Sequence, residues 1–153
     1  MAYYSIDEVK QKMARYCAYQ ERSHYQVEKK LREMGMIPEA IDAIMLFLIQ
    51  EGFLNEERFA RTYVRGKFYQ NRWGKQKIIM GLKQHQIHPN LITTALTEID
   101  NADYQQTIKD LIEKKKMSLP DENSYQTKQK IVRYLAQKGF KYDEFSNLLF
   151  DSF

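Results

Sequence analysis

Residues 27–41 read VEKKLREMGMIPEAI, in which four apolar residues are spaced around a glycine and a proline. The same spacing returns 51 residues later at 78–92, IIMGLKQHQIHPNLI, and 53 residues after that at 131–145, IVRYLAQKGFKYDEF. The recurring apolar residues are Val27, Leu31, Met36 and Ile41; Ile78, Leu82, Ile87 and Ile92; and Ile131, Leu135, Phe140 and Phe145. One pattern repeated at a nearly fixed period indicates a tandem array of similar units.

Helix start and stop signals surround each copy of this pattern. Ser5 and Ser23 each open a capping box, and Asn55 is a further candidate N-cap. Gly35 suits the residue just after a helix end, and Pro38 suits the first turn of the next helix. Gly and Pro are scarce, at 6 and 3 residues, and no segment alternates with a period of 2, so we expect no strands. The expected helices are 5–20, 23–34, 38–51, 55–70, 74–85, 89–98, 101–116, 124–138 and 142–152.

The repeats define the expected architecture. Three helices belong to each copy, so we predict an all-α fold of three tandem three-helix repeats in an elongated, curved array. We place the first repeat at 1–54, the second at 55–100 and the third at 101–153. A unit of this size has a small core, so neighbouring units are expected to abut. The segment 117–123, MSLPDEN, is expected to form an exposed loop within the third repeat.

Composition narrows the class of protein. No run of about 18 apolar residues predicts a membrane span, and the first residues lack the basic and apolar regions of a secretion signal. The single cysteine, Cys17, excludes an intrachain disulfide framework and favours a reducing cytoplasm. We interpret it as a buried, inert thiol, because no partner histidine is indicated. Phosphate-loop and dinucleotide motifs are missing, so we expect no catalytic residues, no cofactor, no metal and no small-molecule substrate.

Positive charge is concentrated in the middle of the chain. Residues 55–90 carry eight Lys and Arg against only Glu56 and Glu57, whereas 1–54 and 91–153 each have a net charge of −1. A concentrated positive field attracts nucleic acid or an acidic protein surface. The second repeat is therefore the basic one and the expected binding region.

The helix expected from residue 55 has one apolar and one basic side. Its arginines Arg58, Arg61, Arg65 and, if the helix extends that far, Arg72 lie opposite the apolar side. Such a row offers bidentate donors to phosphates or carboxylates. The alternative is a solvated face whose arginines pair with acids elsewhere, and the local charge favours binding. The likeliest exception is Arg58, placed to fold back onto Asn55 or a carboxylate.

Trp73, the only tryptophan, follows this helix. It is a candidate for stacking on a base or anchoring a partner, although packing at a helix junction is favoured. We expect Arg61, Arg65, Arg72 and Lys75 to form one exposed basic surface. The full set of candidate binding residues is Arg58, Arg61, Arg65, Lys67, Arg72, Trp73, Lys75 and Lys77.

Three stretches resemble the RecX family of bacterial RecA regulators. They are 52–60, GFLNEERFA, followed by Tyr63-Val64; 23–31, SHYQVEKKL; and 134–140, YLAQKGF. The resemblance runs in order from about residue 10 to the end and coincides with the repeat. The sequence departs from the family at Trp73-Gly74-Lys75, where Gly-Pro is frequent, and at Gln86, where Gly is common.

The resemblance implies an all-α arm that lies in the groove of the RecA–DNA filament. There it is expected to bind RecA, limit filament growth and suppress strand exchange and ATP hydrolysis. The charge of the second repeat, independently of the resemblance, predicts direct phosphate contacts to DNA. No membrane partner is implied. A different class, a stand-alone DNA-binding protein that contacts phosphates without reading sequence, stays open. A hydrolase or nuclease lacks a ligand set or nucleophile in this sequence.

Overall fold

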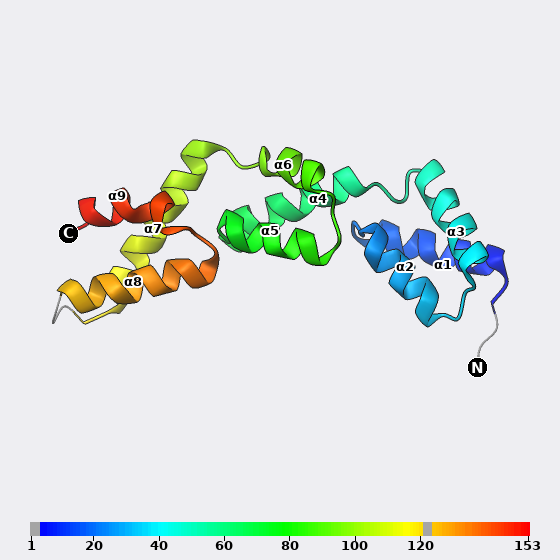
Figure 1. Ribbon diagram of the computed structural model, residues 1–153, viewed down its shortest axis with the longest axis horizontal. Coiled ribbons are helices and arrows are strands. Elements are labelled where there is room, and N and C mark those ends of the chain that lie inside the picture. The colour runs from blue at the N-terminus through cyan, green and yellow to red at the C-terminus, as the bar shows by residue number, and fades with distance from the viewer. Residues whose placement is uncertain (1–3, 121–123) are drawn as a thin grey trace.

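The computed structural model describes residues 4–120 and 124–153, which fold into helices without a strand (Figure 1). Three groups of three helices follow one another along the long axis, with the two chain ends at opposite ends of the molecule. The first group is α1 (Ile6–Tyr19), α2 (His24–Glu33) and α3 (Pro38–Gln50); the second is α4 (Glu56–Arg65) with its π-helical continuation η1 (Gly66–Gln70), α5 (Lys75–Gln84) and α6 (Pro89–Leu96); the third is α7 (Asn101–Ser118), α8 (Ser124–Lys138) and α9 (Tyr142–Asp151). The predicted fold class is therefore confirmed, while the proposed domain boundaries stay a prediction.

The helices begin at the residues that the sequence indicated. The side chains of Ser5, Ser23 and Asn55 accept hydrogen bonds from backbone amides of the first turns of α1, α2 and α4, and Ser23 forms a complete capping box with Gln26. Pro38 occupies the first turn of α3. These local signals act within a few residues of the helix start, which is why sequence alone predicts them.

The second helix of each group ends in the same way. Gly35, Gln86 and Gly139 occupy one repeat position, and all three have positive φ, at 80°, 57° and 101°. After each, an amide reaches back to the carbonyl five residues earlier: Met36 to Leu31 at 3.1 Å, Ile87 to Leu82 at 3.1 Å and Phe140 to Leu135 at 3.0 Å. The repeat therefore conserves a Schellman-type helix end as well as a core.

The repeated apolar residues form the cores. All twelve are buried except Met36, which is partly buried and packs against the first core. The first group has a core of its own, built around residues such as Val27, Leu31 and Ile44. The second and third groups share one continuous core, which runs from Ala60 to Leu149. The array thus has two cores for three units.

The junction of the second and third groups brings two backbones together. The amide of Gly74 donates to the carbonyl of Lys138 at 2.7 Å, and the amide of Gln76 donates to the carbonyl of Gly139 at 3.0 Å. A Cβ atom on Gly74 would lie 2.3 Å from the carbonyl carbon of Gly139. Only a residue without a side chain fits there, which explains a glycine at the start of α5.

One sequence-based boundary was wrong. Met117 and Ser118, expected in the exposed loop 117–123, belong to α7, because this helix continues to Ser118; residues 121–123 of that loop lie outside the described part of the chain. The helix that begins after Asn55 ends at Gln70, as expected, through a π-helical turn. Arg72 lies beyond this end with φ of 57°, so the conditional placement of Arg72 in the arginine row of α4 was wrong.

Among the helices of residues 4–120 and 124–153, none combines the length and the apolar character that a membrane span requires.

Candidate binding surface of the middle unit

The apolar side of α4 packs into the core that the second and third units share. Phe59, Ala60 and Val64 are buried, and Phe68 continues this side into η1. Glu56 and Glu57 stand in the first turn, where acidic side chains stabilise the helix dipole. The arginines therefore point away from the core, as the 3.6-residue period requires.

Arg58 forms internal contacts. Its guanidinium pairs with the Glu21 carboxylate and donates to the carbonyls of Gly52 at 3.0 Å and Phe53 at 3.3 Å. Glu21 lies between α1 and α2, so this arginine connects the first unit to the start of the second. Its donors are directed into the protein, which makes Arg58 a structural residue of this junction and fits the exception expected for it.

Arg61 and Arg65 share one acid. Both guanidinium groups pair with Glu98, which follows α6, with a distance of 2.9 Å between Arg61 Nη1 and Glu98 Oε2. Arg61 also approaches Glu57 at 3.7 Å. The hydrogen bond from Arg65, together with that from Arg61, lowers the pKa of the Glu98 carboxyl. The pairing with a distant acid, one of the two interpretations of the row, is therefore present, and the positive charge of these arginines is partly compensated.

Trp73 packs where the second and third units meet. Its ring is partly buried against their shared core, and the ammonium groups of Lys67 and Lys77 lie 4.7 Å and 4.4 Å from its centre. Lys75 sits 4.5 Å from the ring of Tyr104 on α7. Trp73 thus has the packing position that was favoured, with two cations over the ring.

The predicted binding residues consequently separate into two places. Arg58, Arg61 and Arg65 are engaged with acids at the start of α4 and beside α6. Lys67, Arg72, Lys75 and Lys77, with Trp73, lie around the junction with the third unit, and the residues that the structure describes offer these four cations no ion pair. Whether either group contacts a partner stays a prediction.

Polar contacts also join the first and second units. The Ser23 hydroxyl and His85 Nδ1 are 3.0 Å apart, and the His24 amide donates to Glu56 at 3.1 Å. The His85 ring lies 4.9 Å from that of Phe59. Burial, followed by the charge of Lys67, lowers the pKa of His85, so this ring is a neutral hydrogen-bonding partner at pH 7. The contacts of His24 and His85 thus stabilise the junction between the first and second units.

Basic residues of the third unit were missed from the sequence. Lys138, at the end of α8, donates to the Asn71 carbonyl at 3.2 Å. Burial lowers its pKa, and the charges of Lys77, Lys114 and Arg72 lower it further, which means that these cations lie near one another. The signal was present in the charge of α8 alone, which has four cations and no acid. Averaging over 91–153 hid it, because the acids of the neighbouring segments offset these cations.

Groups suited to metal or thiol chemistry are not assembled in the described ranges. Within residues 4–120 and 124–153 no three His, Cys, Asp or Glu side chains gather at one point. Cys17 is buried, and burial raises the pKa of its thiol. A protonated, covered thiol is a poor nucleophile, in agreement with the interpretation of Cys17 as a core residue.

Comparison with known proteins gives one consistent result. The family models for RecX match in order: the first three-helix domain at residues 10–48, the second at 55–96 and the third at 102–149. The regulatory protein RecX of Pectobacterium atrosepticum is 28% identical over 145 residues, covering 95% of this chain and 86% of that protein. The regulatory protein RecX of Clostridium perfringens strain SM101 is 31% identical over 125 residues, and the match covers 78% of this chain but only 58% of that longer protein.

Solved structures agree with this result. The crystal structure of RecX from Lactobacillus salivarius superposes with a TM-score of 0.86 at 25% identity, covering 95% of both chains. A second crystal structure, of a regulatory protein RecX, gives a TM-score of 0.85 at 24% identity and covers 95% of this chain and 73% of that one. The latter similarity concerns the fold alone.

Proposed function

Because this chain belongs to the RecX family of regulatory proteins, we propose that it regulates the bacterial recombinase RecA by binding RecA or its DNA-bound filament. The observation that carries the proposal is the ordered match of three RecX domains over nearly the whole chain. Relatives that are named regulatory protein RecX support it. The matched region spans only just over half the length of the Clostridium relatives.

We infer that regulation works through binding, without chemistry by the protein itself. An elongated array exposes many helix faces along one direction, and such a shape suits contacts with several subunits of a helical polymer. An elongated protein that bridges or caps RecA subunits changes the growth of the filament. It thereby changes the rates of ATP hydrolysis and strand exchange. The inhibition proposed here requires no cofactor.

The proposed contacts of the middle unit are Lys67, Arg72, Trp73, Lys75 and Lys77. Support comes from their place at one junction and from the lack of compensating acids among the described residues. Arg61 and Arg65 are expected to contribute less, because Glu98 already occupies their donors. Arg58 is left out, since its donors are directed at Glu21 and backbone carbonyls.

Filament binding at matched salt tests the proposal. RecA filaments assembled on single-stranded DNA should bind the protein more tightly than the same DNA without RecA. Neutralising Arg72 and Lys77 to Gln should weaken filament binding about tenfold, equal to ~1.4 kcal/mol. The double change of Arg61 and Arg65 to Gln, which removes the same charge, should have a smaller effect. Equal affinity of the wild-type protein for filament and bare DNA would contradict regulation through RecA.

A further inference from the structure

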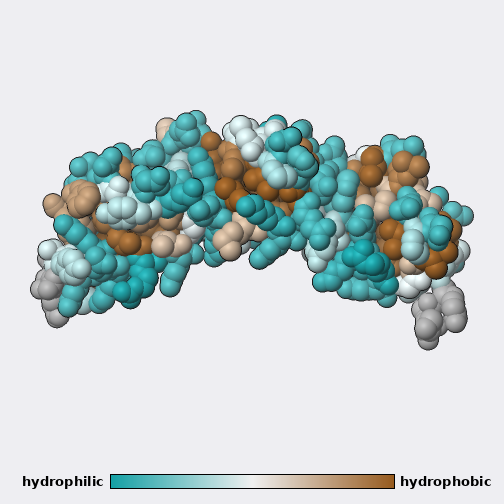
Figure 2. Space-filling model, in the orientation of Figure 1, coloured by the Kyte–Doolittle hydropathy of each residue, from teal (hydrophilic) through white to brown (hydrophobic). Residues whose placement is uncertain are grey.

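The surface of the third unit contains a second concentration of positive charge, on α8. This helix carries Lys128, Lys130, Arg133 and Lys138 and has no acidic residue. Figure 2 shows hydrophilic side chains covering the lower edge of the third unit, where α8 lies in Figure 1. Since this surface is neither part of the middle unit nor of the shared core, its charge has no structural explanation in the packing of the repeats.

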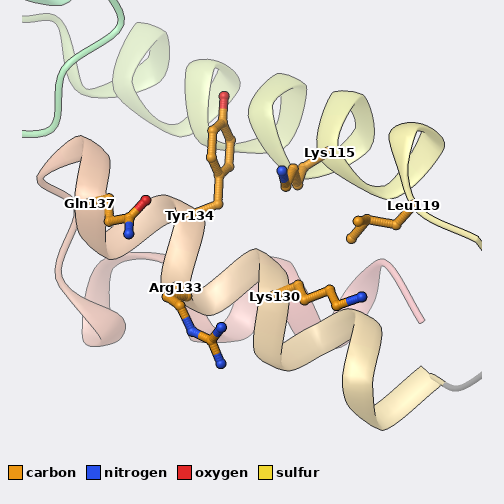
Figure 3. Close-up of a pocket in the computed structure, with 6 residues that line it drawn as sticks. All are labelled: Lys115, Leu119, Lys130, Arg133, Tyr134 and Gln137. Atoms are coloured by element: carbon orange, nitrogen blue, oxygen red, sulfur yellow. The ribbon is translucent and has the colours of Figure 1, made fainter.

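A groove of about 200 Å³ lies between α7 and α8 (Figure 3). Lys115 of α7 and Leu119, which directly follows α7, line one side, and Lys130, Arg133, Tyr134 and Gln137 line it from α8. Arg133 and Tyr134 lie three and four positions after Lys130, and Gln137 lies a further four and three positions on, so the four residues follow one side of the helix. Tyr134 projects from α8 toward α7. The groove is open to solvent, and three of its six residues are cations.

Acids are missing from this groove in the described part of the chain. None of its lining residues is Asp or Glu, and no ion pair of residues 4–120 and 124–153 involves Lys115, Lys130 or Arg133. Instead the Lys115 ammonium lies 5.0 Å from the centre of the Tyr134 ring. The Lys138 ammonium lies 6.0 Å from the centre of the same ring, on the side of the junction with the second unit. The Tyr134 ring therefore positions the ammonium groups of Lys115 and Lys138, and the cations of the groove are available to an anion.

This charge continues into the middle unit. The Lys138 ammonium donates a hydrogen bond to the carbonyl of Asn71 and lies close enough to Lys77, Lys114 and Arg72 for electrostatic repulsion. Lys77 in turn lies over Trp73 at the start of α5. Like α8, α5 contains no acid. The two acid-free helices thus place cations on both sides of the junction, from the α7–α8 groove to Trp73.

The matching helix of the first unit, α2, carries acids that α8 lacks. The repeat register aligns Lys29 with Arg133 and Glu33 with Gln137, and α2 also carries Glu28. Arg32 of α2 pairs with Glu28 at 3.9 Å. A groove between α1 and α2 is also lined by cations, Lys12, Arg15 and Lys30, and by no acid. The third unit differs in that α8 as a whole carries no acid and in that its cations continue through Lys138 to the junction with the second unit.

We propose that the groove between α7 and α8 binds the phosphodiester backbone of single-stranded DNA, whose strand continues across Lys138 toward Lys77. The extended line of cations matches a polymer with regularly spaced charges, and its lysines act as point charges that tolerate any sequence. An acidic protein partner fits less well, because anchoring side chains at protein interfaces usually fill apolar pockets. This groove is open, and Leu119 is the only aliphatic residue that lines it. Aromatic rings beside cations are typical of single-strand binding. This inference goes beyond RecA regulation, since it requires no RecA.

Fluorescence anisotropy of a labelled oligothymidylate, titrated with the full chain at several salt concentrations, tests the proposal. The double variant K130Q/R133Q should bind at least about tenfold more weakly at low salt, and the slope of log K against log salt should fall by about 1 to 2. The variant K29Q/K109Q is the matched control, because it removes the same charge from exposed positions of α2 and α7 that lie outside the α7–α8 groove, and it should leave affinity nearly unchanged. Circular dichroism should show all three proteins folded.

Two results would overturn the inference. One is an unchanged affinity of K130Q/R133Q for the oligothymidylate, or an equal loss in both double variants, which would indicate only the effect of net charge. The other is a variant that binds bare DNA like the wild-type protein but loses affinity for RecA filaments, which would assign the groove to a protein surface. If the wild-type protein bound RecA filaments no more tightly than bare DNA, the function proposed above would be contradicted instead. The two failures are therefore distinguishable.

Discussion

At the scale of single residues, one backbone position controls the end of the second helix in every unit. Gly35, Gln86 and Gly139 all have positive φ there, and glycine adopts this conformation at no steric cost. Gln86 stands where the related family commonly has Gly, and it still adopts the left-handed conformation. The fold therefore imposes this conformation on the backbone whichever residue is present.

Reciprocal substitutions test this explanation. Gln86→Gly should raise the free energy of unfolding by up to about 1 kcal/mol, because it relieves left-handed strain, whereas Gly35→Ala should lower it by about 1 kcal/mol. No heavy atom lies within 4 Å of a Cβ built on Gly35, so the second effect isolates the backbone conformation. Urea unfolding measures both. Stabilisation by Gly35→Ala would show that positive φ carries no penalty there.

Gly74 allows the closest backbone contact of the described junction between the second and third units. Gly74→Ala should destabilise the protein by about 1–3 kcal/mol, because its Cβ would overlap the Gly139 backbone. Gly66→Ala is the control: Gly66 has φ of −65°, and its Cβ would meet nothing within 4 Å. Thermal unfolding followed by circular dichroism compares the two. A neutral Gly74→Ala variant would mean that the two units are less tightly joined than described.

At the scale of helices, α4 is fixed to the residue after α6 by the two arginines on Glu98. The pKa of Glu98 is lowered in the folded state from its usual value of 4.5, so the pairing stabilises the fold above that pH and this stabilisation is lost as the pH falls below it. Glu98→Gln should therefore reduce the midpoint of urea unfolding at pH 7. The difference from the wild-type protein should shrink when the same measurement is repeated well below pH 4.5.

Glu113→Gln is the matched control for this test. Glu113 is exposed on α7 and takes part in no ion pair among the described residues, so its removal should leave the midpoint unchanged at both pH values. A deficit of Glu98→Gln that persists undiminished in acid would show that Glu98 acts through packing or hydrogen bonding and that its charge is unimportant.

Helix ends and core positions could be predicted from sequence because they depend on neighbours within about one turn or on the repeat itself. The ion pairs could not, since Arg61 and Arg65 meet an acid that lies 37 and 33 residues away and approaches only through the packing of α6 on α4. The expected single surface of Arg61, Arg65, Arg72 and Lys75 assumed a continuous helix, which the π-helical turn and the left-handed Arg72 interrupt. The groove between α7 and α8 is formed by side chains of two helices. A search for cations along single helices therefore could not predict it.

At the scale of the whole molecule, the two cores predict unequal coupling between the units. The second and third units share a core, whereas the first has its own and meets the second through polar contacts such as Ser23 with His85. We expect the second and third units to unfold together and the first to unfold as a separate unit. The molecule is then an array with one rigid and one weaker junction.

Leucine substitutions at one repeat position test this division. Leu31, Leu82 and Leu135 are all fully buried, and each change to Ala should cost about 2–5 kcal/mol. Leu82→Ala and Leu135→Ala should reduce hydrogen-exchange protection throughout residues 56–149, while Leu31→Ala should reduce it only in α1 to α3. A uniform loss of protection across all described helices in Leu31→Ala would show a single cooperative unit.

The proposed function of the whole molecule is that this three-unit array acts on RecA. The most direct test measures ATP hydrolysis by RecA on single-stranded DNA while the purified protein is added from sub-stoichiometric amounts upward. If the protein caps or bridges filaments, turnover and filament extension should fall well before one molecule is present per RecA subunit. Turnover and extension that stay unchanged in the presence of folded protein would contradict the claim.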